Sequence, residues 1–183
     1  RGHQPQSQKL ERSLCRLCSW GQSLVNFFES LHMPHLVILY TGQLDAETNM
    51  KALCRDLADA MLTVVDEAGK QVFPTGGTRV LAYPAPHYAV ADGGAAGRKA
   101  AQFDNNPQGG SEDYAFVYLN VRMGKGRSEA THKRAGETLI DVTKKHFADL
   151  FAKRHIGITL QIDVGPEVFD HKHSNLHPLF AAL

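Results

Sequence analysis

The sequence predicts an α/β fold of the two-layer α+β kind, in which a four-stranded mixed sheet carries two helices on one face. Two observations predict it: four β-rich apolar segments have the length of strands, and two longer segments have apolar residues at helical spacing. Their order along the chain is β-α-β-β-α-β. Each helix is long enough to connect two parallel strands, so two similar halves would share one sheet.

The first strand is expected over residues 34–41, where a near-continuous apolar run predicts burial on both faces. Asp45 is expected to cap the helix that follows, and Gly69 and Pro74 would close it off. The apolar residues of this helix recur at i, i+3 and i+4 spacing: Met50, Leu53, Leu57 and Met61. The pattern is typical of a helix that covers a sheet with one face.

The second strand is expected over residues 76–83, because Pro84 and Pro86 would end it. The segment 92–112 that follows is rich in Gly, Ala, Asn and Gln and contains one proline. This is the composition of a loop, and the segment is longer than most connections in a compact domain. We interpret it as a mobile flap or as an insertion.

The second half of the chain repeats the pattern of the first. Residues 113–123 and 156–164 are the third and fourth expected strands, and Ser128 is expected to cap the long helix between them. The buried side of this helix is expected to contain Leu139, Ile140, Val142, Phe147, Leu150 and Phe151.

Both faces of the expected sheet carry apolar residues, although the two helices cover only one. The residues concerned are Val37, Leu39, Val80, Phe116, Tyr118, Ile158 and Leu160. Something else must cover the second face, and association with further copies of the chain is the economical answer.

Composition narrows the range of partners and of locations. The formal net charge is +1 and the 20 basic residues are spread along the chain, so neither a nucleic acid nor a membrane surface is an expected partner. No apolar run approaches the roughly 20 residues that span a bilayer. Three cysteines argue against a disulfide framework and favour a reducing compartment, so we expect a cytoplasmic protein.

Two regions of the chain differ in character. Residues 1–32 are expected to be an extension that is weakly ordered or no part of the native enzyme, and residues 33–183 are expected to form one domain that includes the long loop 92–112. Cys15-x-x-Cys18 and the three histidines near the end of the chain, His171, His173 and His177, have no second pair at zinc-finger spacing. We therefore expect no metal.

The dipeptide Met33-Pro34 opens the organised sequence. A methionine followed by proline is normally trimmed, so a translation start at Met33 would leave Pro34 with a secondary amine. An α-amino group titrates at roughly 7.7 to 8.0, and burial or nearby arginines lower that pKa, so the amine could serve as a general base. When Met33 stays attached, the same nitrogen is an amide and cannot be a base.

Five separated patches then appear in a characteristic order: Met33-Pro34-His35, Phe73-Pro74 with Gly77 and Arg79, Asp113-Tyr-Ala-Phe-Val117, Gly124-Lys-Gly-Arg-Ser128 with Ala135-Gly-Glu137, and Asn175-Leu-His177. In these patches the chain resembles the 5-carboxymethyl-2-hydroxymuconate isomerase family of the tautomerase superfamily, from Met33 to about Phe180. The resemblance implies a homotrimer of β-α-β-β-α-β subunits that works without metal or cofactor.

The resemblance also assigns roles to individual residues. It implies that Pro34, Arg79 and Arg127 are catalytic, and that His35 and the same two arginines bind substrate. The implied substrate is a small carboxylated dienol, which the family ketonises in the breakdown of the aromatic compound homoprotocatechuate. A planar guanidinium suits such carboxylates because it can donate two parallel hydrogen bonds.

Two other readings stay open. One is a tautomerase that acts on a different enol. The other is a trimer that binds ligands without catalysis, because the extension keeps the Pro34 nitrogen blocked.

Overall fold

A computed structural model describes residues 35–103 and 114–165, all of which lie in the compact unit Met33–Leu183. Four strands of this part form one sheet, in the order β2-β1-β3-β4. Their bounds are His35–Thr41 for β1, Arg79–Ala85 for β2, Ala115–Gly124 for β3 and Ile156–Gly165 for β4. β1 and β2 are parallel, β3 and β4 are parallel, and β1 and β3 are antiparallel, which confirms the mixed sheet.

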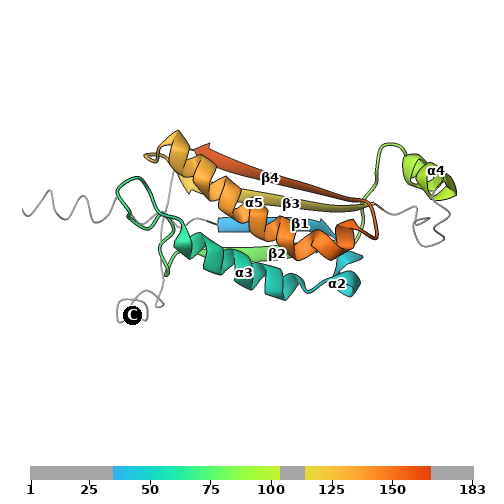
Figure 1. The fold of residues 1–183 in the computed structure, drawn as a ribbon, viewed down its shortest axis with the longest axis horizontal. Coiled ribbons are helices and arrows are strands. Elements are labelled where there is room, and N and C mark those ends of the chain that lie inside the picture. The colour runs from blue at the N-terminus through green and yellow to red at the C-terminus, as the bar shows by residue number, and fades with distance from the viewer. Residues whose placement is uncertain (1–34, 104–113, 166–183) are drawn as a thin grey trace, which may run out of the picture. The chain divides into compact units, whose positions relative to one another are not determined.

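The two long helices lie side by side on one face of the sheet (Figure 1). Helix α3 spans Met50–Thr63 between β1 and β2, and helix α5 spans Glu129–Phe151 between β3 and β4. Two shorter helices, α2 over Leu44–Glu47 and α4 over Ala95–Phe103, lie toward the other end of the sheet from the start of β1. The predicted fold class is thereby confirmed.

The core lies between the sheet and the two long helices. The apolar residues predicted for the first helix are all buried in α3, and Leu139 and Phe147 are buried in α5. Phe151, in contrast, is 47% exposed because it is the last residue of α5, so its predicted burial is wrong.

Within the single chain, only one face of β1 is buried. Leu36 and Ile38 are fully buried under the helices, whereas Leu39 is 48% exposed on the opposite face. We call this opposite face the open face. Its apolar side chains include Val37, Leu39, Leu81, Tyr83, Phe116 and Tyr118. Val80, Ile158 and Leu160 belong instead to the helix side, where they pack against the core.

Helix α3 is capped by Asn49 and not by the predicted Asp45. The Asn49 side chain accepts a hydrogen bond from the Ala52 N–H at 3.0 Å, while Asp45 lies inside α2 and accepts one from the Tyr40 hydroxyl at 2.6 Å. The cap must directly precede the first helical residue, and α2 separates Asp45 from that point.

Strand β2 begins and ends later than predicted. The Gly77 and Thr78 N–H groups both donate to the Pro74 carbonyl at 3.0 Å, so the first predicted residues form a turn. Pro84 lies within the strand, which is possible because β2 is an edge strand and needs hydrogen bonds on one side only.

The predicted loop 92–112 contains helix α4. Four of the nine residues of α4 are alanine, the strongest helix former, and the Asp92 carboxylate accepts hydrogen bonds from the N–H groups of Gly94 and Ala96 at its start. The Gly97 N–H donates to the Tyr114 hydroxyl at 2.6 Å and ties α4 to β3. Residues 104–113 lie outside the described part of the chain.

Candidate active site

A row of four polar side chains crosses the sheet at the start of β1. His35 pairs with Arg79 on β2 and with Arg122 on β3, and Arg122 pairs in turn with Asp163 on β4. Their neighbours Leu36 and Val121 are buried toward the helices, so the row belongs to the open face. The sheet therefore brings His35 and Arg79 together, as the sequence predicted for the site.

The imidazole of His35 lies between two cations. Its Nδ1 atom is buried and has no hydrogen-bond partner in the described part of the chain. Burial lowers the pKa of His35 below its ordinary value of 6.5, and the positive charges of Arg79 and Arg122 lower it further. The ring is therefore neutral at neutral pH and leaves the net positive charge of the row to the arginines.

Arg122 and Asp163 were not singled out from the sequence. Each lies on a strand, and only the register of the sheet shows that Arg122 is opposite His35 and that Asp163 is opposite Arg122. The Asp163 carboxylate accepts hydrogen bonds from Asn120 at 2.8 Å and from Gln161 at 2.7 Å. These bonds, and to a smaller extent the charge of Arg122, lower the pKa of Asp163. The alternation of Phe116, Tyr118, Asn120 and Arg122 is the one signal that could have pointed to Arg122.

The turn between β3 and α5 contains Arg127 and lies at the same end of the sheet, because β3 ends beside the start of β1. Its guanidinium donates to the Val72 carbonyl at 3.1 Å and to the Gly124 carbonyl at 3.3 Å. The side chain is half-buried, and this burial lowers the pKa of Arg127. Ser128 caps α5 as predicted, because its hydroxyl accepts a hydrogen bond from the Thr131 N–H at 3.0 Å.

The remaining predicted residue, Pro34, directly precedes His35 in the chain but lies outside the described residues. Its role in the site stays a prediction. Cys15, Cys18 and the three C-terminal histidines also lie outside the described residues, so the expectation that they bind no metal stays a prediction. Within 35–103 and 114–165, no group of three or more His, Cys, Asp or Glu side chains could hold a metal ion. No helix of these ranges is long and apolar enough to cross a membrane.

A second feature, a cleft of ≈ 660 Å³, lies at the opposite end of the sheet. Its walls are mainly apolar and include Phe116, Phe151 and Ile156, together with Arg154 and His155. None of the described residues predicted for the site lines this cleft.

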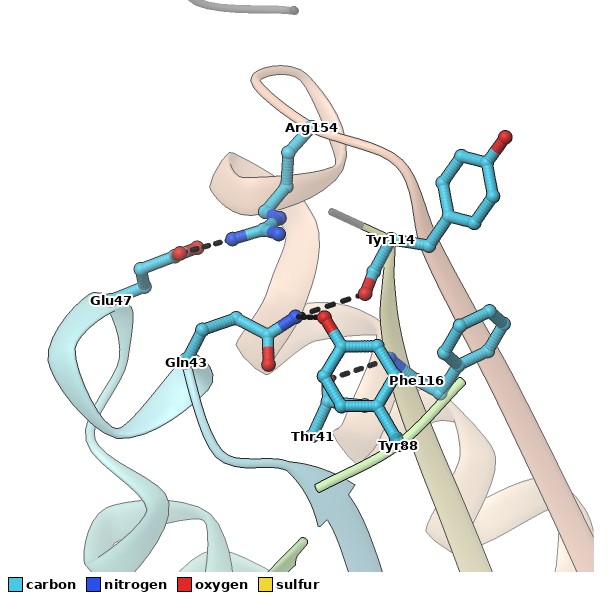
Figure 2. Close-up of polar contacts among 7 residues, drawn as sticks. All are labelled: Thr41, Gln43, Glu47, Tyr88, Tyr114, Phe116 and Arg154. Carbon is cyan, nitrogen blue, oxygen red and sulfur yellow. Dashed lines mark hydrogen bonds and ion pairs between the residues drawn. The ribbon is translucent and has the colours of Figure 1, made fainter. Parts of the chain in front are cut away.

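The chain around the cleft is held by polar contacts that Figure 2 shows. The Gln43 side chain donates to the Tyr88 hydroxyl at 2.7 Å and to the Tyr114 carbonyl at 2.9 Å, and the Phe116 N–H donates to the Thr41 hydroxyl at 3.1 Å. These bonds fasten the segments on either side of α4 to the end of β1.

An ion pair between Arg154 and Glu47 joins the end of α5 to α2 at the same end of the molecule (Figure 2). The contacts at this end connect backbone segments to one another, whereas the row at the start of β1 presents side chains on the open face. The row, with the adjoining Arg127 turn, is the candidate active site.

Comparisons with a family model, with a curated protein and with solved structures all give the same family of isomerases. The family model for 5-carboxymethyl-2-hydroxymuconate isomerase matches residues 34–180. The Escherichia coli 5-carboxymethyl-2-hydroxymuconate Delta-isomerase is 25% identical over 148 residues, which cover 81% of this chain and 99% of that protein.

Two solved structures are also similar. A crystal structure of a 5-carboxymethyl-2-hydroxymuconate delta-isomerase has 60% sequence identity and a TM-score of 0.75, and the match covers 84% of this chain and 96% of that one. A 5-carboxymethyl-2-hydroxymuconate isomerase from Deinococcus radiodurans R1 has 33% identity and a TM-score of 0.61, with coverages of 81% and 94%.

Proposed function

Because this chain belongs to the 5-carboxymethyl-2-hydroxymuconate isomerase family, we propose that it ketonises 5-carboxymethyl-2-hydroxymuconate or a similar 2-hydroxydienoate. The chain is an isomerase with the tautomerase fold. The observation that carries the proposal is the family match, whose first residue is Pro34, next to a His35 flanked by two arginines. The proposed setting is homoprotocatechuate breakdown in the cytoplasm.

The proposed base is the nitrogen of Pro34, after removal of everything that precedes it. The neutral secondary amine takes the proton from the enol hydroxyl, and the conjugated chain receives a proton at a carbon further along. One O–H bond breaks, one C–H bond forms, and the double bonds shift, so no cofactor is required. The positive charges beside His35 disfavour a second positive charge on the proline nitrogen and hold its pKa down.

Arg79 and Arg127 are the proposed partners of the substrate carboxylates, with His35 beside them. Arg79 lies in the row at the start of β1. Arg127 has five N–H donors, and its bonds to Val72 and Gly124 leave others for a ligand. A guanidinium is well suited to a planar carboxylate because two parallel hydrogen bonds fix its orientation.

We further propose that the chain works as a homotrimer and that residues 33–183 form the functional domain. The open face supports self-association, since its exposed Leu39, Leu81, Tyr83 and Phe116 would be buried by another copy. The family match begins at residue 34 and supports the assignment of residues 1–32 as an extension.

The test follows the ultraviolet absorbance of 5-carboxymethyl-2-hydroxymuconate with two preparations, the full chain and a chain that begins at Pro34. We expect decay with the second preparation and little with the first, because only a free proline nitrogen can act as a base. A Pro34→Ala version of the shorter chain is the matched control, since it keeps an N-terminal amine but replaces the proline ring.

The other results would redirect the proposal. Absence of activity in both preparations would favour a different enol substrate or a ligand-binding trimer without catalysis. Equal activity of the shorter chain and its Pro34→Ala version would show that an N-terminal amine suffices and that the proline ring is not required.

A further inference from the structure

Arg122 has the position of a binding residue. It lies two residues before the end of β3, exposed on the open face, and is the cross-strand partner of His35. Its charge contributes to the lowered pKa values of both His35 and Asp163. Arg79 stands on the other side of His35, so the two arginines flank one imidazole.

The guanidinium of Arg122 does not hold other parts of the described chain together. No hydrogen bond or ion pair joins its guanidinium to another residue of ranges 35–103 and 114–165. The nearest acid in the row, Asp163, gives its two oxygens to the amides of Asn120 and Gln161. Arg127 differs, because two backbone carbonyls hold its guanidinium in place.

We propose that Arg122 is a further substrate-binding residue, which with Arg79 flanks His35 and pairs with a carboxylate of the substrate. This proposal rests on the proposed function. The substrate proposed above has three carboxylates, two on the muconate chain and one on the carboxymethyl group. In this arrangement Arg79 and Arg122, on either side of His35, take the two carboxylates of the muconate chain, and Arg127 in the adjoining turn takes the carboxymethyl carboxylate.

The test measures binding by the full chain with two probes that lack the enol hydroxyl and cannot be ketonised. The first is cis,cis-muconate, and the second is sorbate, which has a six-carbon diene chain and one carboxylate instead of two. Calorimetric titration gives the dissociation constant for each. We expect Arg122→Gln to weaken muconate binding about tenfold and sorbate binding much less, because one charge-assisted pair is lost.

Two control variants make the result specific. Lys144→Gln removes one positive charge from the exposed surface of α5 and should leave both dissociation constants within about twofold. Arg122→Lys keeps the charge and should recover part of the muconate affinity. Circular dichroism of each variant checks that the sheet is intact.

Three results would overturn the proposal: unchanged muconate binding in Arg122→Gln, an equal loss for both probes, or the same loss in Lys144→Gln. The outcome is separate from that of the proposed function, because binding of these probes requires no proton transfer. Isomerase activity together with unchanged binding by Arg122→Gln would remove Arg122 and leave Pro34 in place.

Discussion

Arg127 connects two segments that are distant in the sequence. Its bonds to the Val72 and Gly124 carbonyls link the connection before β2 to the end of β3. A lysine ammonium cannot donate in two directions from a planar fork, so Arg127→Lys should lower the free energy of unfolding by about 1 to 2 kcal/mol. Denaturant titration measures this loss. The exposed neighbour Lys125 is the control, and Lys125→Gln should change stability by less than ~0.5 kcal/mol.

Gly97 is fixed by its contact with Tyr114. A Cβ atom at this position would lie 2.8 Å from Cε1 of the Tyr114 ring, whose hydroxyl is held by Asp92 and by the Gly97 N–H. We expect Gly97→Ala to separate α4 from β3 and to cost about 1 to 3 kcal/mol.

Hydrogen exchange tests this expectation by following the amides of α4. The amides should exchange faster in Gly97→Ala, while those of α3 keep their protection. Unchanged exchange in α4 would show that the ring can move aside. Gly93→Ala is a useful contrast, because its strain would come from a φ of +58° with no atom near the new Cβ.

At the scale of elements, helix α3 depends on its cap. Asn49→Ala removes the bond to the Ala52 N–H and should destabilise the protein by about 1 kcal/mol. Asn49→Ser keeps an acceptor in place and should retain most of the stability. Thermal unfolding of the two variants decides the matter, and equal melting temperatures would contradict the assignment of the cap.

A contact between α5 and the segment that joins α2 to α3 makes the stability of the protein depend on pH. The Nε2 atom of His146 lies 2.8 Å from the Thr48 hydroxyl, and its ring packs edge-on against Phe147. Burial lowers the pKa of His146 below 6.5, and Asp56 only partly opposes this. Below pH 6.5 the unfolded state therefore binds more protons than the native state, and the free energy of unfolding falls as the pH decreases.

We expect His146→Gln to flatten this slope between pH 7.5 and the folded pKa of His146. His35 also has a lowered pKa and contributes a slope of the same sign, which remains in the variant. Urea titrations across this pH range test the difference. An identical slope in both proteins would mean that His146 is equally easy to protonate in the native and unfolded states.

At the scale of the whole molecule, the open face is the largest feature left to explain. Leu39→Lys places a charge among Leu81, Tyr83 and Phe116, and should weaken self-association at least tenfold if this face is buried between copies. Sedimentation at several concentrations measures the change. Val65→Lys is the control, since Val65 is an exposed apolar residue outside the sheet, and the two variants should differ clearly.

The periodicity of the sequence predicted the sheet, the two long helices and the buried face of α3 because these depend on local alternation. The cap at Asn49 and the turn before β2 were missed because each depends on backbone bonds that composition does not specify. Helix α4 was missed because its alanines lie among loop-forming residues. His35 and Arg79 could be named from motifs, whereas Arg122 became visible only through the register of β3 with β1.

The position of Pro84 has one more consequence. A sheet polymerises when strands of other molecules add to both of its edges, and each addition needs an unbroken row of N–H donors. Pro84 removes one donor from that row near the end of β2, one of the two edges of this sheet. The template for fibre growth on this side is therefore shorter than the strand, which helps β2 to remain an edge strand without recruiting further strands.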